Sequence, residues 1–300
     1  MRLISADELK EALPYERLVR ALPERLLAGA TTPQRPVFDL GKEASLLLMP
    51  AWAPNLGGVK IVHVTPENAR RNLPCVAASY LVFDGETHRH LALIDGEELT
   101  ARRTAAVAAV AMNRLAKPDA ERLLLIGSGR IASELPFAFR AVRDLKSVAV
   151  FSPTRANAET LVLRLIDAGF DAIVCEDIAQ HIAVSDLIAC ATLSQRPWIE
   201  GCHLSDQHVS LIGGFTPEMR EADRETLDRA RVYIDTPAAL GTAGDLEGVS
   251  LDQVAGQLLD LCDPMFKTEA GLSVFKSVGE AAQDLATAQV LFDSPNRGSE

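Results

Sequence analysis

The feature that most constrains the fold is the stretch RLLLIGSGRIA at residues 122–132. Its apolar run, 123–126, predicts a short buried strand, and the glycines after it predict a tight turn before a helix at 130–139. A strand, a glycine turn and a helix in this order are typical of a dinucleotide-binding unit. We predict that Gly127 permits the turn and that Gly129 lets backbone N–H groups approach a pyrophosphate. The alternative is that this stretch is the glycine turn of an α/β protein that binds no nucleotide.

Composition limits the class of protein. The chain has 300 residues, of which 48% are hydrophobic and 24% charged, which is typical of one large or two medium globular domains. The net charge of −11 argues against a nucleic-acid partner. The sequence has no apolar run long enough for a membrane span and does not begin like a signal peptide. Its five scattered cysteines form no CxxC pair, which predicts a cytoplasmic protein without a structural metal.

The first part of the chain, residues 1–113, predicts a mostly antiparallel sheet flanked by helices. The opening helix, 6–30, follows Ser5, which is predicted to form a capping box with Glu8. Thr100 is predicted to cap a long alanine-rich helix. The short strands expected between these helices are 45–52, 58–64, 76–84 and 90–96.

Residues 114–276 instead alternate apolar runs with helical spacers, which predicts the doubly wound parallel sheet of a Rossmann domain. A last helix is predicted to begin at Ser277, with Glu280 completing a second capping box, and to complete the first domain. The predicted fold class is therefore α/β, with a discontinuous α+β domain formed by 1–113 and about 277–300. The strands expected in the Rossmann domain are 122–127, 147–152, 171–175, 186–192, 208–214 and 231–235.

The end of the second Rossmann strand predicts which cofactor binds. In an NAD site an acidic residue near this point holds the ribose hydroxyls. Here the strand is followed by Ser152, Pro153, Thr154 and Arg155, with no carboxylate among them. Hydroxyl groups and a guanidinium suit a 2′-phosphate, so we predict that NADP(H) is preferred and that NAD(H) is the alternative. The alternative is that Arg155 is only a solvated residue of the next helix and does not contact the cofactor.

Three cationic residues precede the nucleotide-binding stretch. Arg103 follows Thr100 in the first turn of its predicted helix, Lys60 lies within an apolar strand, and Arg35 lies in a loop. A guanidinium binds a carboxylate through two parallel hydrogen bonds. Each residue alone is typical of a surface charge, and together they are consistent with a substrate that carries a carboxylate. Spacing alone leaves open whether the three side chains converge.

Longer stretches match one known family in order: MPAW at 49–52, GVKIV at 58–62, LTARRTAA at 99–106, IGSGRIA at 126–132 and VFKSVGEAAQDL at 274–285. On these stretches the chain resembles the ornithine cyclodeaminase and mu-crystallin family along nearly its whole length. The resemblance implies a Rossmann domain, a substrate and dimerisation domain, and a homodimer.

The resemblance also implies roles for single residues. In the family, the positions of Arg35, Lys60 and Arg103 bind the substrate carboxylate or the cofactor phosphates. We predict Lys60 as the catalytic proton donor. The alternative donors are a water held by Arg103, or Ser210, Thr216 or His63. The positions that line the dinucleotide in the family correspond to Arg130, Ile131, Ser152, Thr192, Leu211 and Ser277.

One departure from the family pattern is informative. Cyclodeaminases carry an aspartate where this chain has Phe215, and a second acidic position falls at about Leu47. Cyclodeamination uses a carboxylate to orient an amine and move protons, whereas a preformed cyclic imine needs only a carboxylate clamp, a nicotinamide and a proton source. An apolar Phe215 suits a small ring and disfavours a distal ammonium. The alternative is that this segment only begins a helix, with Thr216 as N-cap and Pro217 at its first position.

The resemblance and this departure together predict an NADPH-dependent ketimine reductase. Its substrate would be Δ1-pyrroline-2-carboxylate, giving L-proline, or the six-membered Δ1-piperideine-2-carboxylate, giving L-pipecolate. The alternatives are ornithine cyclodeaminase or alanine dehydrogenase activity, and a non-catalytic NADPH-binding protein. The three cationic residues argue against the last, because binding of NADPH alone does not need them.

Overall fold

The computed structural model describes residues 1–71 and 73–293, and the chain divides into two compact units. Unit 1 is Met1–Arg103 with Glu280–Glu300, and unit 2 is Thr104–Gly279. The division falls inside helix α3 (Gly96–Leu115), earlier in the chain than the predicted boundary after residue 113. Residues 294–300, for which a frayed tail is expected, lie outside the described residues. Within the described ranges, no helix combines the length and apolar character that crossing a bilayer requires.

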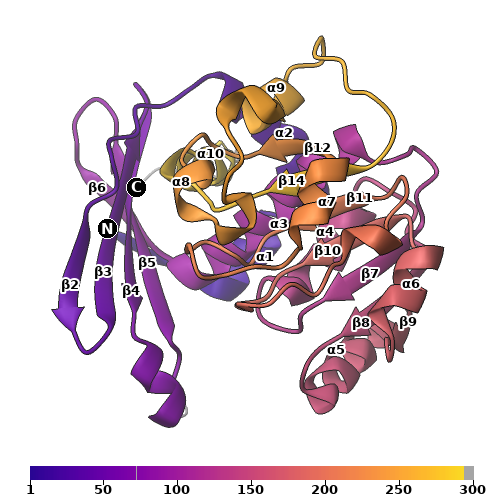
Figure 1. Ribbon diagram of the computed structural model, residues 1–300. Coiled ribbons are helices and arrows are strands. Elements are labelled where there is room, and N and C mark those ends of the chain that lie inside the picture. Colours follow the sequence, from indigo (N-terminus) through magenta and orange to yellow (C-terminus); the bar gives the residue numbers. More distant parts are fainter. Residues whose placement is uncertain (72, 294–300) are drawn as a thin grey trace. The chain divides into compact units, whose positions relative to one another are not determined.

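Unit 1 contains a six-stranded sheet in the order β1-β6-β5-β4-β3-β2 (Figure 1). The pairing of β1 with β6 is parallel, and the other pairs are antiparallel, so the predicted mostly antiparallel sheet is confirmed. The two edge strands escaped prediction, because β1 is very short and β2 is exposed along its whole length. The bounds are β1 Arg2–Ile4, β2 Val37–Gly41, β3 Ala44–Trp52, β4 Leu56–Val64, β5 Val76–Asp84 and β6 His90–Asp95.

The predicted opening helix is two helices, α1 (Ala6–Ala12) and α2 (Tyr15–Leu27). The chain breaks at Pro14, because proline lacks the N–H that a continuous helix needs and its ring clashes with the preceding turn. The predicted capping box is confirmed: the Glu8 N–H donates to Ser5 Oγ at 3.3 Å, and the Ser5 N–H donates to Glu8 Oε2 at 2.8 Å.

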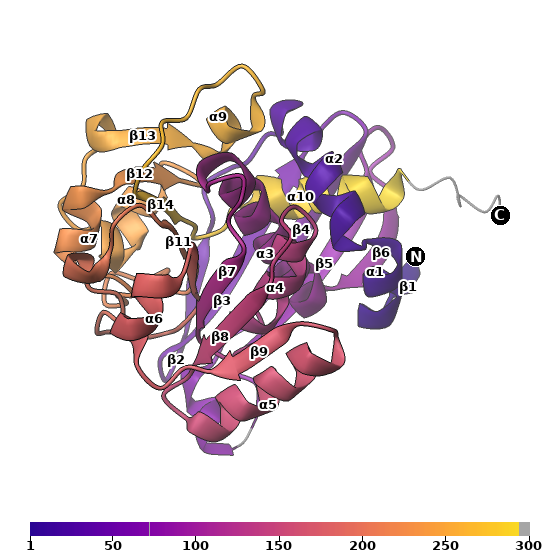
Figure 2. The ribbon, with the colours of Figure 1, turned by 90° about the vertical axis from the view of Figure 1, so that its right-hand side faces the viewer.

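The other two helix starts of unit 1 were predicted wrongly. Helix α3 begins at Gly96, and Thr100 lies inside it with its hydroxyl donating to the Gly96 carbonyl. Asp95 accepts the Glu98 N–H at 2.8 Å and so caps this helix one turn earlier. Helix α10 (Ala281–Phe292) has Glu280 as its N-cap residue, without a side-chain cap bond. It packs against α2, β3 and β4, and Figure 2 shows it in yellow beside α2. A 3₁₀ helix, η1 (Pro66–Arg71), completes the elements of this unit.

Unit 2 contains an eight-stranded sheet in the order β13-β12-β14-β11-β10-β7-β8-β9. All its strand pairs are parallel, so the predicted Rossmann-type sheet is confirmed. Two strands were missed: β13 contains a glycine, and β14 has only two apolar residues, which lie between Ser273 and Lys276. The bounds are β7 Arg122–Ile126, β8 Ser147–Phe151, β9 Asp171–Val174, β10 Leu187–Cys190, β11 His208–Leu211, β12 Arg231–Ile234, β13 Val254–Gln257 and β14 Ser273–Lys276.

The helices of unit 2 cover a sheet whose central strands β10 and β11 are buried along their whole length. The helix after the glycine turn begins at residue 132 as a 3₁₀ turn, rather than at 130. No helix starts at Thr216, which instead accepts the Met219 N–H in a turn, so that alternative is wrong. The bounds are η2 Ala132–Glu134, α4 Leu135–Arg140, α5 Arg155–Asp167, α6 Ile178–Val184, η3 Gly201–His203, α7 Arg224–Arg229, α8 Ala239–Thr242, η4 Gly244–Leu246, η5 Leu251–Gln253 and α9 Leu258–Cys262.

Candidate functional site

The glycine turn joins β7 to η2 in unit 2. Gly127 has φ +120°, and a Cβ there would lie 2.5 Å from the Ala191 carbonyl oxygen at the end of the neighbouring β10. Only glycine fits both the backbone conformation and this close approach. At Gly129, in contrast, an added Cβ would meet no atom within 4 Å. The turn is therefore tightly packed at its first glycine and open at its second.

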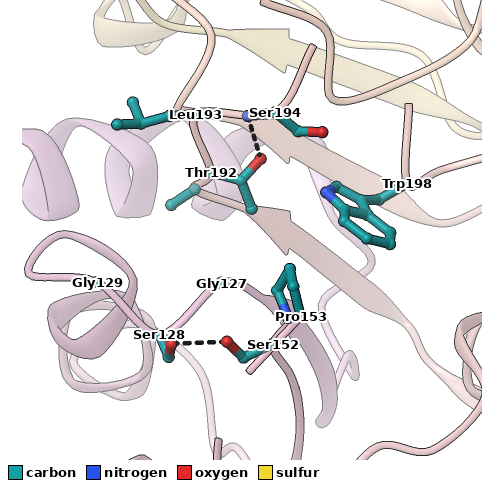
Figure 3. A pocket seen from close by; sticks show the side chains of 10 residues that line it. Gly127, Ser128, Gly129, Ser152, Pro153, Thr192, Leu193, Ser194 and Trp198 are labelled. Carbon is teal, nitrogen blue, oxygen red and sulfur yellow. Dashed lines mark hydrogen bonds between the residues drawn. The ribbon is translucent and has the colours of Figure 1, made fainter. Parts of the chain in front are cut away.

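A cavity of about 380 Å³, which we call the first cavity, lies at the carboxyl ends of β7, β8 and β10 (Figure 3). Of the strands in this sheet, β7 comes first in the chain, and β8 and β10 pair with it on opposite sides. The carboxyl end of β7 is therefore the topological switch point, where α/β proteins bind nucleotides. The Ser128 hydroxyl donates to Ser152 Oγ at 2.9 Å within it. The lining residues are Gly127, Ser128, Gly129, Ser152, Pro153, Ala191, Thr192, Leu193, Ser194 and Trp198.

The first cavity contains four of the predicted cofactor residues, namely Gly127, Gly129, Ser152 and Thr192. The structure gives Leu211 and Ser277 different surroundings. The Leu211 side chain is 0% exposed and belongs to the core of unit 2. Ser277 is 2% exposed, and its hydroxyl donates to Asp235 Oδ2 at 2.8 Å. Both side chains contribute to the packing of unit 2, and their contact with the cofactor stays a prediction.

The remaining predicted cofactor residues lie around the glycine turn and the start of α5. Arg130 is exposed and lines a second cavity, while Ile131 is half-buried. Thr154 is the exposed N-cap residue of α5. Arg155 is paired with two carboxylates, those of Glu159 and Glu176, so its guanidinium is already occupied.

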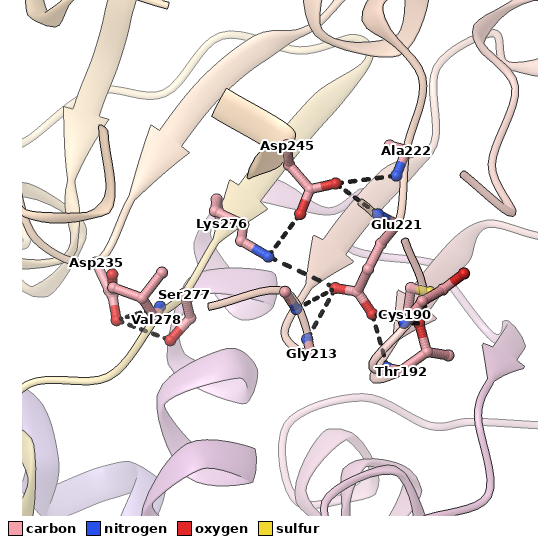
Figure 4. A network of polar contacts seen from close by, with 12 residues as sticks. Cys190, Thr192, Gly213, Glu221, Ala222, Asp235, Asp245, Lys276, Ser277 and Val278 are labelled. Carbon is pink, nitrogen blue, oxygen red and sulfur yellow. Dashed lines mark hydrogen bonds and ion pairs between the residues drawn. The ribbon is translucent and has the colours of Figure 1, made fainter. Parts of the chain in front are cut away.

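A buried carboxylate joins the segments that follow β10 and β11 (Figure 4). Glu221 is 0% exposed, accepts the Thr192 N–H at 2.7 Å through Oε1 and accepts the Gly213 N–H at 2.8 Å through Oε2. The Gly214 N–H also donates to Oε2, at 3.3 Å. Because Thr192 lines the first cavity, Glu221 fixes part of its wall.

The charge of Glu221 is balanced inside the same network. Lys276 Nζ lies 3.6 Å from Glu221 Oε2 and 2.8 Å from Asp245 Oδ2, and all three side chains are buried. Asp245 Oδ1 also accepts the Glu221 N–H at 2.6 Å. Burial raises the pKa of Glu221, while the Lys276 ammonium opposes that rise. The two acids are therefore bound within the protein rather than presented to a ligand.

Unit 1 brings two of the three predicted cationic residues together around Asp284 of α10. Lys60 Nζ of β4 lies 2.7 Å from Asp284 Oδ2, and Arg103 Nε of α3 donates to Asp284 Oδ1 at 2.9 Å. Arg103 Nη1 also donates to Gln283 Oε1 at 2.8 Å. Lys60, Arg103 and Asp284 are 2%, 4% and 0% exposed, so the three charges share one site with little water.

Burial sets the protonation behaviour of Lys60. Burial is the main cause that lowers the pKa of this ammonium from 10.5 to about 8; Asp284 opposes the shift, and the positive charges of Arg103 and Arg35 contribute to it. Arg35 is exposed but close enough to act on Lys60. The three predicted cations therefore share one electrostatic environment with a single carboxylate. An ammonium with a pKa near 8 can transfer a proton at neutral pH.

Tyr80 lies beside this group. It is the register partner of Lys60 in the pairing of β4 with β5, and its hydroxyl is buried without a hydrogen-bond partner among the described residues. Burial, and then the charge of Asp284, raise the pKa of Tyr80 well above its usual value. A Cβ at Gly58 would lie 2.3 Å from the hydroxyl, so this glycine makes room for it. Tyr80 thus adds a neutral hydroxyl to a strongly charged site.

The structure also bears on the alternative proton donors. Ser210 is fully buried, and its hydroxyl bonds to His208 Nε2 at 3.0 Å, which leaves it no access to a ligand. His63 is exposed and Thr216 is half-buried. Phe215, in the segment after β11, is 41% exposed, so its ring is accessible.

One group of side chains has ligand atoms suited to a metal. Glu200, Cys202 and His203 place these atoms within 4.8 Å of one another on the surface of unit 2. All three side chains are exposed and come from one short turn. Exposed groups of this kind are common without an ion, so this group carries no metal proposal.

The sequence as a whole matches a known family. A model of the ornithine cyclodeaminase/mu-crystallin family matches residues 16–299. The chain belongs to this family. It is 32% identical over 284 residues to a Delta(1)-pyrroline-2-carboxylate reductase of Paracoccus denitrificans, which covers 89% of this chain and 90% of the relative. It is 30% identical over 310 residues to the ketimine reductase mu-crystallin of Rattus norvegicus, covering 98% and 97% of the two chains.

Solved structures of family members resemble this fold along its length. The structure of Delta(1)-pyrroline-2-carboxylate reductase from Thermococcus litoralis in complex with NADH and L-proline has a TM-score of 0.91 and 26% sequence identity. The match covers 97% of this chain and 96% of that one.

Sequence reasoning missed the buried acids of this family member. Asp284 is the one charged residue of α10, and a single charge within a mostly apolar helix was the available signal. Glu221 and Asp245 lie outside any strand or long helix, so no periodic pattern marked them. These acids can be recognised as part of a buried network only when the fold shows the residues that they contact.

Proposed function

We propose that this protein reduces a cyclic imino acid with NADPH. The observation that carries the proposal is the shared site of Lys60 and Arg103 on Asp284, with Arg35 nearby. Three cations face one carboxylate there, so the site keeps an excess of positive charge. A small substrate that bears a carboxylate would neutralise it.

The residues of unit 1 can take separate roles in this reaction. Arg103 and Arg35 would bind the substrate carboxylate through charge-assisted hydrogen bonds. Lys60, with its pKa at about 8, would give a proton to the imine nitrogen. The reduced nicotinamide, when bound, supplies the hydride that adds to the adjacent carbon. Carbon gains the hydride and nitrogen the proton, so the C=N bond becomes the C–N bond of a cyclic amino acid.

The comparisons support the substrate class. The relatives from Paracoccus denitrificans and Rattus norvegicus, at 32% and 30% identity, are named as reductases of Delta(1)-pyrroline-2-carboxylate and of ketimines. The Thermococcus litoralis structure at 26% identity holds NADH and L-proline. We infer Δ1-pyrroline-2-carboxylate as the main substrate of this chain, with its six-membered homologue as a second one. The preference for NADPH is inferred from the lack of a carboxylate directly after β8.

The exposed edge strand of unit 1 supports the homodimer that the family resemblance implies. Val37, Phe38 and Leu40 of β2 are all about half exposed, at 57%, 48% and 54%. Apolar side chains grouped on an edge strand are typical of a surface that pairs with another chain.

The second candidate function is that of a cyclodeaminase whose catalytic carboxylate lies at another position in the chain. The acids near Gly213 and Gly214, namely Glu221 and Asp245, are bonded to backbone N–H groups and to Lys276. Neither is exposed to a ligand, and Phe215 occupies the position of the family's aspartate. This arrangement supports reduction over cyclodeamination.

A spectrophotometric panel tests the function. NADPH and NADH are each mixed with the five- and six-membered cyclic imines, with pyruvate plus ammonia, and with ornithine. We expect the fastest cofactor oxidation with NADPH and the five-membered imine, without a need for ammonia. Oxidation that depends on pyruvate and ammonia would identify an amino-acid dehydrogenase. Conversion of ornithine to proline and ammonia without net cofactor turnover would identify a cyclodeaminase.

Replacing Phe215 tests whether its side chain contacts the ring of the cyclic imine. Phe215→Asp is expected to lower kcat/KM for the cyclic imine about tenfold, because a charged side chain replaces an apolar contact and must be desolvated. Phe215→Leu keeps an apolar surface and serves as the matched control, with kcat/KM close to the original. Both are measured by steady-state oxidation of NADPH. Equal rates for the two variants would remove Phe215 from the substrate site.

A further inference from the structure

Glu221 is a buried acid that the proposed reaction does not use. Its two carboxylate oxygens bond to different parts of unit 2 (Figure 4). Oε1 accepts the Thr192 N–H at 2.7 Å and the Thr192 hydroxyl at 3.2 Å. Oε2 accepts the N–H groups of Gly213 and Gly214 at 2.8 and 3.3 Å. One side chain therefore joins the segment after β10 to the segment after β11.

The segment after β10 forms a wall of the first cavity, which is lined by Thr192, Ser194 and Trp198 among others. The backbone at Glu221 is bonded to this wall as well. The Trp198 N–H donates to the Glu221 carbonyl at 2.9 Å, and the N–H of the preceding Arg220 donates to the Ser194 carbonyl at 2.7 Å. A ligand that contacts this wall would therefore restrict both the backbone and the side chain of Glu221.

The segment after β11 leads to Phe215, which is proposed to contact the imine ring. The two residues before Phe215 are glycines whose surroundings leave no room for a side chain. A Cβ at Gly213 would lie 1.9 Å from the Thr192 carbonyl oxygen. A Cβ at Gly214 would lie 2.8 Å from Asp245 Oδ2. The start of this segment is thus packed between the cavity wall and the buried charges, so it cannot shift without disturbing one of them.

Glu221 carries its charge in this arrangement, because the backbone and hydroxyl groups bonded to its side-chain oxygens are all donors. Lys276 Nζ lies 3.6 Å from Glu221 Oε2 and 2.8 Å from Asp245 Oδ2, so one ammonium serves two carboxylates. Glu221→Gln removes the excess negative charge of these three residues and keeps the side-chain size. A functional defect of this variant would therefore come from a lost hydrogen bond rather than from an unpaired charge.

We infer that Glu221 is a positioning residue that links the first cavity to the segment carrying Phe215, so that a dinucleotide bound in the cavity also fixes residues 213–216. The inference rests on the proposed function for the cofactor and for the role of Phe215. In this role Glu221 contacts neither ligand and transfers no proton. It orders the segment that meets the imine when the cofactor is in place.

Glu221→Gln should break one end of this link and keep the other. A glutamine side chain has one acceptor oxygen and one amide nitrogen that only donates. The Lys276 ammonium and the two glycine N–H groups favour the oxygen at the position of Oε2. The amide nitrogen then faces the Thr192 N–H, where two donors meet. The glycine bonds are therefore kept, and the bond from the carboxylate to the cavity wall is lost.

Amide hydrogen exchange of the full chain, followed residue by residue with and without saturating NADPH or NADH, tests this link. In the original protein we expect either cofactor to slow exchange at Gly213 and Gly214 at least about fivefold, because fixing the cavity wall suppresses local openings. In Glu221→Gln the exchange without cofactor should stay near the original rate, and either cofactor should slow it less than about twofold. Calorimetry establishes saturation for each protein.

Asp223→Asn is the matched control. Asp223 also accepts two backbone N–H groups, those of Gly201 and Thr226 at 3.0 and 2.9 Å, but none of these three residues lines the first cavity. This variant should lower the thermal stability and keep the slowing that the cofactor causes.

A second measurement needs no variant. The N–H groups of Thr192, Gly213 and Gly214 share Glu221 as their acceptor, so in the original protein the cofactor should slow all three by similar factors. Slowing at Thr192 alone, no slowing in the original protein, or equal slowing in Glu221→Gln would overturn the inference. Slowing that depends on Glu221 in a protein that reduces no cyclic imine would instead refute the proposed substrate and keep the link.

Discussion

Arg103→Ala is expected to raise the KM for the cyclic imino acid about 100-fold, because truncating one side of a buried, hydrogen-bonded charge pair costs about 2–5 kcal/mol. Arg103 is 4% exposed and is held by Asp284 and Gln283, so no water-exposed residue can replace its guanidinium. Because the contact is made to the bound carboxylate in ground and transition states alike, kcat should fall much less than kcat/KM. Steady-state oxidation of NADPH at varied imine concentrations measures both constants.

The neighbouring arginine provides the control. Arg102 is also buried, but its Nη2 and Nε donate to the Leu13 carbonyl at 2.7 and 3.0 Å and it pairs with Glu98. Arg102→Lys should therefore lower the thermal stability and leave the KM for the imine unchanged. A folded Arg103→Ala protein whose KM rises less than about threefold would contradict the assignment of a substrate carboxylate to this site.

Asp284→Asn is expected to move the alkaline limit of activity to lower pH. Burial lowers the pKa of Lys60 to about 8, and the carboxylate of Asp284 is the main group that opposes this shift. Without that charge the pKa of Lys60 should fall by about one to three further units, since a close opposite charge changes a pKa by that amount. If Lys60 is the donor, it gives its proton only below its pKa, so we expect activity to decline above about pH 8 in the original protein and from near or below neutral pH in the variant.

The pH profile of kcat, measured from pH 5.5 to 9.5, distinguishes this role from a purely structural one. A loss of folded protein would lower kcat at every pH, whereas a lowered pKa moves the alkaline limb. Gln283→Leu is the matched control, because Gln283 bonds to Arg103 but is not among the groups that shift the pKa of Lys60. Its alkaline limb should stay in place. An unshifted limb in Asp284→Asn would exclude Lys60 as the proton donor.

Much of the fold follows from local patterns. The glycine turn and the buried runs of unit 2 each predict a parallel strand, because strands covered on both faces read as continuous apolar segments. The pattern fails where a strand carries a polar residue with a distant partner, as at Lys276 in β14. It also fails where one proline divides a helical stretch, as at Pro14.

The candidate site was harder to predict than the fold. Lys60 and Arg103 stand out in sequence because each is a cation among apolar or alanine-rich neighbours. Asp284 carries the opposite charge, but it is distant in sequence from both, and only the tertiary fold shows that it bonds to them. The burial of Leu211 and the bond between Ser277 and Asp235 could not be predicted either, because a position along a strand does not show which way its side chain faces.

The origin of Asp284 in the last helix has a consequence during synthesis on the ribosome. Residues 1–103 contain both buried cations, but their shared counter-ion lies in the segment that follows the whole of unit 2 in the chain. A nascent chain or a fragment that lacks residues 280–293 would have to bury an unpaired ammonium and an unpaired guanidinium, which costs several kcal/mol for each ion. Unit 1 can therefore close only after α10 has been translated, so we expect a chain that stops before residue 280 to leave this unit open.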